Sequence, residues 1–153
     1  MTMAFYTRSF PGVPEQVAEA RHWAEDVLTT AVHGPGTPDE TTATAVLLLS
    51  ELCTNAIRHT HTGRQGGRFT VSLVLTPGQL EARVADNGAA DSAPRLLSTG
   101  PDAEQGRGLH LVRHFADHTG PLPQGCGVFF RLAWATTSSA PTPARAGVKG
   151  EDR

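Results

Sequence analysis

The stretch that decides the fold is Ser50-Glu51-Leu52-Cys53-Thr54-Asn55-Ala56-Ile57-Arg58-His59. Within it, Glu51, Asn55 and His59 recur every fourth residue, so an α-helix places all three on one side. Apolar residues at helical spacing continue this pattern from about residue 38 towards residues 61–63. The stretch therefore predicts one long helix that is apolar on one side and carries a row of polar groups.

That polar row suggests a ligand. An acid, an amide and an imidazole along a mostly apolar helix cost desolvation free energy unless each group finds a partner. A hydrated Mg²⁺ ion with a phosphate chain would supply partners, because Mg²⁺ prefers oxygen ligands and keeps several waters. The plain alternative is a solvated polar face, and the spacing alone does not decide between the two.

The elements around this helix predict an α+β fold. We expect an edge strand at residues 5–10, a helix at 14–32, and a strand hairpin at 68–75 and 80–85. A third helix is expected to begin at Gly106 and to end at residues 120–123, before a final strand at 127–134. This order favours a two-layer sandwich in which about three helices cover one face of a mixed β-sheet.

A single domain is expected to span residues 1–134. Residues 135–153 are rich in Ala, Thr, Ser, Pro and Gly, a composition typical of a disordered tail. Residues 87–105 show little periodicity and predict a long loop, which in compact domains is usually a functional lid or disordered.

Composition excludes several classes of protein. A formal net charge of -2 without a block of Lys or Arg does not favour nucleic acid as the main partner. The longest aliphatic run is far too short to cross a bilayer, and the start lacks the layout of a signal peptide, so we expect a cytoplasmic protein. Cys53 and Cys126 are expected to be reduced thiols that pack as small apolar groups.

A second motif, Asp86-Asn87-Gly88, closes the hairpin. An Asp at the end of a buried strand can accept a hydrogen bond from the exocyclic amine of adenine. Gly88 would let the backbone approach a flat base closely. An ordinary Asp-Asn-Gly turn is the alternative.

The third motif is Gly106-Arg107-Gly108 at the expected start of a helix. Backbone N–H groups at a helix start, together with the helix dipole, favour phosphate oxygens. The motif is not a Walker loop, because no Gly-Lys-Ser/Thr follows, and it does not follow the first strand of a βαβ unit as a Rossmann fingerprint does.

Taken together and in this order, the three motifs resemble the N-box and the two glycine boxes of the GHKL superfamily. That superfamily includes DNA gyrase B, heat-shock chaperones and sensor histidine kinases, which share the Bergerat ATP-binding fold. The run from Gly106 to Val112 and the segment Phe10-Pro11-Gly12 are most similar to the anti-sigma factor serine/threonine kinase branch. The resemblance covers about residues 5–134.

The resemblance implies a role for each motif. Glu51 would be the general base of phosphoryl transfer, Asn55 would hold Mg²⁺, and Asp86 would read the adenine of ATP. Residues 89–105 would form the ATP lid, in which Ala90 stands where the family often has a second glycine. The other implied nucleotide contacts are His59, Gly88, Gly106, Arg107, Gly108, Leu109 and His110.

The resemblance also implies a function and partners. The chain would be a regulatory protein serine/threonine kinase that acts as an anti-sigma factor and phosphorylates a small anti-anti-sigma partner, with a homodimer as its assembly. Two alternatives stay open. One is a non-catalytic ATP-binding module that switches partners; the other is a detached histidine-kinase catalytic domain, for which His22 lacks the acidic neighbour expected of a phosphate-accepting histidine.

Overall fold

The computed structural model describes residues 3–30, 37–59, 66–87 and 110–136. Within these ranges a short helical segment spans residues 110–115. The named elements are β1 (Ala4–Pro11), α1 (Glu15–Thr30), α2 (Asp39–His59), β2 (Arg68–Thr76), β3 (Gln79–Ala85), β4 (His118–Pro121) and β5 (Gly127–Ala133).

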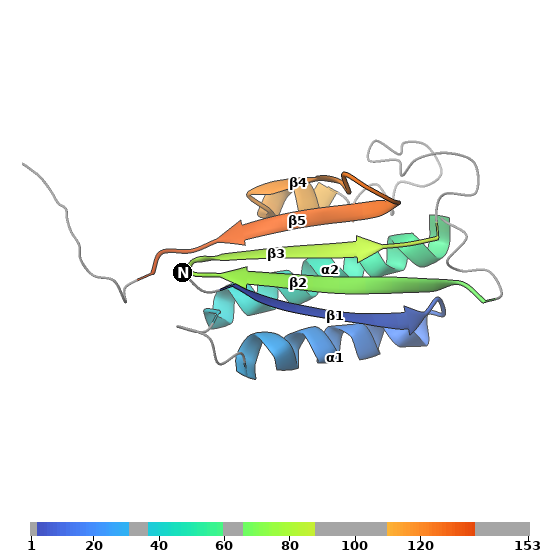
Figure 1. Cartoon of the computed structure of the whole chain (residues 1–153), viewed down its shortest axis with the longest axis horizontal. Coiled ribbons are helices and arrows are strands. Elements are labelled where there is room, and N and C mark those ends of the chain that lie inside the picture. The colour runs from blue at the N-terminus through green and yellow to red at the C-terminus, as the bar shows by residue number, and fades with distance from the viewer. Residues whose placement is uncertain (1–2, 31–36, 60–65, 88–109, 137–153) are drawn as a thin grey trace, which may run out of the picture.

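The strands form one sheet with the order β1-β2-β3-β5-β4, and the helices cover one of its faces (Figure 1). This confirms the α+β two-layer sandwich. All four strand pairs are antiparallel, so the expectation of a mixed sheet was wrong. The predicted edge position of β1 is confirmed.

Strand β4 explains this correction. The sequence led us to expect one helix between β3 and the last strand, which would favour a parallel crossover. Instead, the helical segment ends at residue 115, and β4 reverses the chain once more before β5. Gly120 and Pro121 were taken for helix terminators, but they lie in an edge strand, where proline is tolerated. Phe115, the last residue of the helical segment, is 48% exposed.

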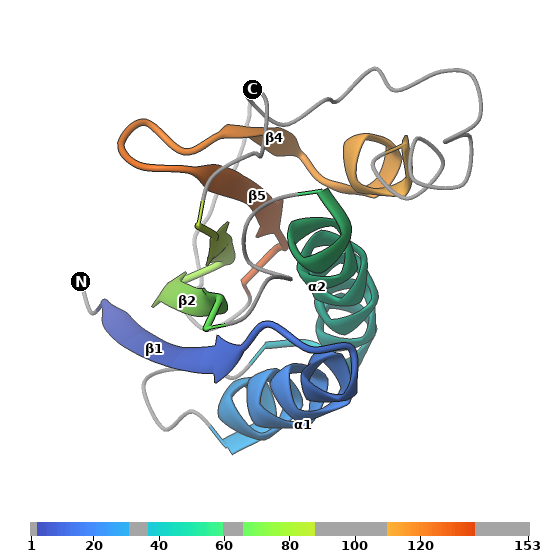
Figure 2. The same ribbon diagram turned by 90° about the vertical axis from the view of Figure 1, so that its right-hand side faces the viewer.

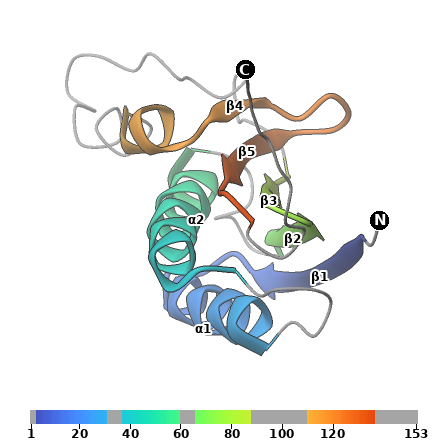
Figure 3. The ribbon, with the colours of Figure 1, turned by 90° about the vertical axis from the view of Figure 1, so that its left-hand side faces the viewer.

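The core lies between the sheet and the two long helices. Figures 2 and 3 show both long helices on the same side of the sheet, with α1 next to β1 and α2 next to the middle strands. The rings of Phe10 and Phe69 stack with their centroids 5.4 Å apart at one end of this layer. Of the named elements, helix α2 contributes the most residues to this core, as a buried stripe of Ala45, Leu48, Leu49, Leu52, Cys53 and Ala56.

The two cysteines are free and lie in different surroundings. Cys53 is buried in the core, and burial raises the pKa of its thiol to about 12, so it behaves as a small apolar group. Cys126 is exposed, so the expectation that it also packs as an apolar group was wrong. It lies in the turn between β4 and β5.

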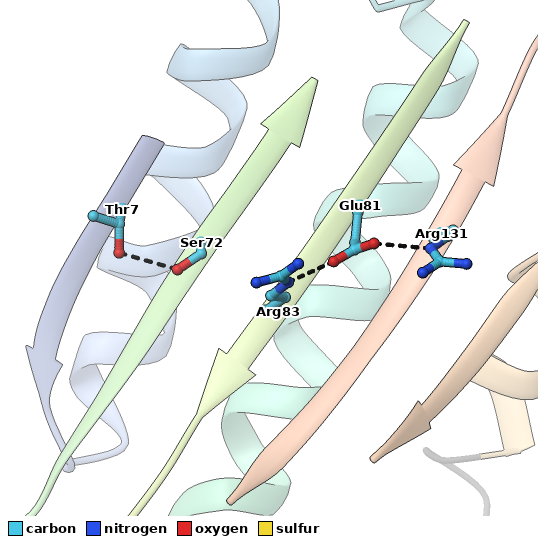
Figure 4. A network of polar contacts seen from close by, with 5 residues as sticks. All are labelled: Thr7, Ser72, Glu81, Arg83 and Arg131. Carbon is cyan, nitrogen blue, oxygen red and sulfur yellow. Dashed lines mark hydrogen bonds and ion pairs between the residues drawn. The ribbon is translucent and has the colours of Figure 1, made fainter. Parts of the chain in front are cut away.

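The face of the sheet without helices carries a polar network (Figure 4). Thr7 and Ser72 share a hydrogen bond of 3.0 Å between β1 and β2. Glu81 on β3 lies between two guanidinium groups, those of Arg83 and of Arg131 on β5. Burial alone would raise the pKa of Glu81, but the hydrogen bonds and charges of Arg131 and Arg83 outweigh it and hold that pKa below its usual value.

Among the described helices, none is both long and apolar enough to cross a membrane.

Candidate functional site

Helix α2 positions the first two candidate residues. Its buried stripe packs against α1 and the sheet, and Glu51 and Asn55 lie on the flank of that stripe, each half-buried. The row predicted from the fourfold spacing is therefore neither fully in the core nor fully solvated. His59 is the last residue of α2.

Among the described residues, two buried polar groups on this helix lack a hydrogen-bond partner: the hydroxyl of Thr42 and the amide of the candidate residue Asn55. Its Nδ2 atom is buried and has no hydrogen-bond partner in the described part of the chain. A buried amide without a partner costs about 1–3 kcal/mol. Since Asn amide nitrogen and oxygen are assigned by their partners, the same position can turn its oxygen to an incoming cation. The site thus fits a ligand that completes the amide's contacts.

The last residues of β3 and the turn beyond it hold the next candidate, Asp86. Its backbone N–H donates to the carbonyl oxygen of Cys126 at 3.0 Å, which ties Asp86 to the start of β5. The neighbouring Asn87 accepts a hydrogen bond from the backbone N–H of Arg68, with 2.7 Å between Oδ1 and the nitrogen. Asp86 is half-buried. Together, these two bonds hold the chain around Asp86 from the strands on either side.

Gly127 makes this arrangement possible, and the sequence reasoning missed it. Its φ is +143°, a conformation that favours glycine. A Cβ atom added there would lie 2.1 Å from the carbonyl oxygen of Val84 and 2.9 Å from the Cα of Ala85. Only a glycine lets β5 approach the end of β3 this closely. The Gly-Cys-Gly run directly before a strand was the available signal.

Helix α2 and strand β3 end together. Both run towards the right-hand end of the molecule in Figure 1, and Figure 2 looks onto that end. Helix α2 also packs directly against β3. The turn of α2 that carries Asn55 and the strand end that carries Asp86 thus belong to the same end of the sandwich, although about 30 residues of chain separate them.

The glycine motif, Gly106-Arg107-Gly108, lies entirely outside the described residues, and the described chain resumes at residue 110. The described residues include His110, which is helical and exposed at the start of the segment 110–115; this segment lies beside α2 (Figures 2 and 3). Val112 of the same segment is buried in the core. The predicted lid with Ala90 and the other candidates of this region fall outside the described ranges: Gly88, Gly106, Arg107, Gly108 and Leu109.

Comparison with known proteins identifies the family. A model of the histidine kinase-like ATPase domain matches residues 10–125. The chain belongs to the histidine kinase-like ATPase family. Two similar relatives are named serine-protein kinase RsbW, from Listeria monocytogenes and Listeria innocua. Each is 31% identical over 121 residues, which cover 72% of this chain and 74% of the relative.

Membership confirms the resemblance found in the sequence and the fold that it implied. An ATPase domain implies ATP binding. The role of each named residue is not settled by family membership and stays a prediction. The unpartnered amide of Asn55 is a fitting position for a Mg²⁺ ligand, because an amide oxygen is among the ligands that Mg²⁺ accepts.

Proposed function

We propose that the chain is an ATP- and Mg²⁺-dependent protein serine/threonine kinase that acts in the cytoplasm as an anti-sigma factor. Its substrate is a Ser or Thr on a small anti-anti-sigma partner, and its other partner is a sigma factor. Support comes from the kinase names of the relatives and from the three-motif resemblance of this sequence. The observation that carries the proposal is the buried, unpartnered amide of Asn55 at the end of the sandwich where Asp86 closes β3.

In this proposal, three residues of the chain have separate roles. Asp86 accepts a hydrogen bond from the adenine amine, and backbone bonds of Asp86 to Cys126 and of Arg68 to the side chain of Asn87 hold the chain around it. Asn55 turns its amide oxygen to Mg²⁺, which when bound neutralises charge on the phosphates. Glu51 lies one turn earlier on the same flank of α2 and accepts the proton of the attacking hydroxyl as general base.

Titration calorimetry with ATP tests the binding site. Wild-type protein should bind ATP in the presence of Mg²⁺, and Asn55→Ala should weaken binding roughly 10- to 100-fold, the usual effect of losing a contact to a charged group. Chelation of Mg²⁺ should weaken wild-type binding and leave the variant little changed. Thr44→Ala, which alters a side chain nearer the start of α2, is the matched control. Binding that depends on neither Mg²⁺ nor Asn55 would remove the metal assignment.

Mass spectrometry tests the reaction. A candidate anti-anti-sigma protein incubated with the chain and Mg·ATP should gain about 80 Da on a Ser or Thr. Glu51→Gln should lower the transfer rate roughly 10²- to 10⁴-fold and leave ATP affinity near that of wild type. Undiminished transfer by this variant would exclude Glu51 as the base. Nucleotide-dependent binding of the partner without any mass gain would identify a non-catalytic partner-switching module instead.

A further inference from the structure

We propose that Asn87 is a positioning residue that holds Asp86 in place for adenine recognition. This inference rests on the proposed role of Asp86 in binding the adenine of ATP. It concerns the side chain between Asp86 and Gly88, to which the motif itself gives no task.

The end of the strand ladder shows what Asn87 does. Strands β2 and β3 pair antiparallel as far as Thr70 and Ala85. One step along the same register would bring Phe69 opposite Asp86, and the next brings Arg68 opposite Asn87. There the backbone N–H of Arg68 donates to the side-chain oxygen of Asn87, at 2.7 Å. A side chain thus takes the place that a backbone carbonyl holds along the rest of the ladder.

This contact extends the support of Asp86 to a second strand. On the β5 side, the backbone N–H of Asp86 donates to Cys126. On the β2 side, the bond to Arg68 holds the side chain of Asn87, so the backbone around Asp86 is held from both directions. The backbone that carries the carboxylate of Asp86 is therefore in place before any ligand arrives, which lowers the entropic cost of binding.

Arg68 is itself held in place. Its Nε donates to Oγ of Ser9 at 3.0 Å, and its Nη2 donates to the carbonyl oxygen of Ser9 at 3.3 Å. The acceptor residue belongs to β1, which pairs with β2 along its whole length. The donor that Asn87 uses is thus part of a two-strand unit, and this makes it a firm anchor for the turn.

The side-chain type at position 87 has a further consequence. Asn supplies the acceptor oxygen without a charge. Asp would supply the same acceptor but would add a negative charge beside Asp86, where the nucleotide binds. The two effects, loss of the acceptor and gain of charge, can therefore be separated by two substitutions at the same position.

Nucleotide discrimination is the measurement that separates positioning from folding. Guanine offers a carbonyl where adenine offers its amine, so a fixed carboxylate favours ATP over GTP. A variant that merely folds less well loses ATP and GTP binding in equal proportion. We therefore compare the dissociation constants of Mg·ATP and Mg·GTP for each variant by titration calorimetry.

Asn87→Ala should lower ATP affinity about threefold to tenfold, the usual effect of one neutral hydrogen bond, and leave GTP affinity nearly unchanged. Asn87→Asp should weaken both nucleotides and keep their ratio, because it retains the acceptor. Gln79→Ala, an exposed change at the opposite end of β3, is the matched control and should alter neither constant.

Two results would overturn the inference: an unchanged ratio in Asn87→Ala, or a ratio that falls equally in Asn87→Asp. The proposed role of Asp86 is tested separately by Asp86→Asn. If that variant keeps wild-type discrimination, Asp86 does not read adenine and the proposed function itself fails. If Asp86→Asn loses discrimination while Asn87→Ala keeps it, only the positioning role is wrong.

Discussion

Two polar regions of this molecule differ in whether their polar groups find partners among the described residues. On the open face of the sheet, Glu81 carries a charge and has two guanidinium partners from its own chain. On the flank of α2, Asn55 is uncharged, and its buried Nδ2 has no partner among the described residues. The charged group is satisfied at the surface and the neutral one is left unsatisfied inside.

The difference separates a polar group that is satisfied within the protein from one that we propose binds a ligand. A carboxylate that already accepts from two arginines has little left to offer a ligand. An unpartnered buried amide costs free energy in the protein alone and regains it when a ligand supplies the missing contact. Polar groups at binding sites commonly lower the stability of the empty protein for this reason. The predictions below test that contrast, from the largest expected effect to the smallest.

The largest effect is expected at Gly127, which lets β5 approach the end of β3 that precedes Asp86. Gly127→Ala should destabilise the protein by about 2 kcal/mol or more, because the added Cβ would clash with the backbone of β3. Gly120→Ala is the matched control, since its Cβ would meet only the ring of Phe129 at an ordinary 3.5 Å. Urea denaturation of both variants measures the difference. Equal stabilities of the two variants would contradict the close approach of β5 to β3.

An effect of intermediate size is expected at Asn55, where the substitution should stabilise the protein instead of destabilising it. In the absence of nucleotide, Asn55→Leu should raise the free energy of unfolding by roughly 1 kcal/mol, because it removes a buried donor without a partner and adds a good helix former. Denaturant titration without ATP or Mg²⁺ is the measurement. The same variant should lose Mg²⁺-dependent ATP binding. A lower stability of the empty variant would show that the amide is satisfied within the protein, and the contrast with Glu81 would disappear.

The smallest effect is expected at Glu81. Glu81→Gln should lower the free energy of unfolding at pH 7 by roughly 0.2–1 kcal/mol, since the side chains of both arginine partners are partly exposed, to 45% and 41%, and water screens the pairs. The pKa of Glu81 is lower in the folded protein than in the unfolded chain, so its stabilisation is complete above the unfolded pKa of about 4.3.

That stabilisation is lost as the pH falls through the folded pKa. The gap between wild type and Glu81→Gln should therefore shrink in acid and also shrink in high salt. Thermal unfolding between neutral and acidic pH measures it, with Thr7→Val as a control that removes a neutral contact on the same face. A gap independent of pH would mean that the charge of Glu81 contributes nothing.

Most of the fold could be predicted because its elements carry local signals. The apolar period of α2, the Pro-Gly turn of the hairpin and the alternation of β2 are properties of neighbouring residues, and the helix and the two strands that they predict are each confirmed. Strand β4 could not be predicted, because four residues rich in turn formers adopt a strand only through pairing with β5. The antiparallel direction of β5 follows from that pairing and was missed with it.

The candidate site likewise has features that the sequence predicts and features that it does not. The residue types at positions 51, 55 and 86 follow from the sequence, since their chemistry and spacing are local. The support of Asp86 by Arg68, Asn87 and Cys126 joins residues from three strands, and no spacing rule along the chain reveals it.

By itself, the sequence of this protein determined the family, the α+β class and the helix that carries the polar row, because hydrophobic period and short motifs act over a few residues. Only the tertiary structure decided that the buried Nδ2 of Asn55 has no partner in the described chain and that glycine is required at position 127. Both depend on which atoms meet across the fold, and packing at that distance is set by the whole sheet and its helices rather than by any one segment.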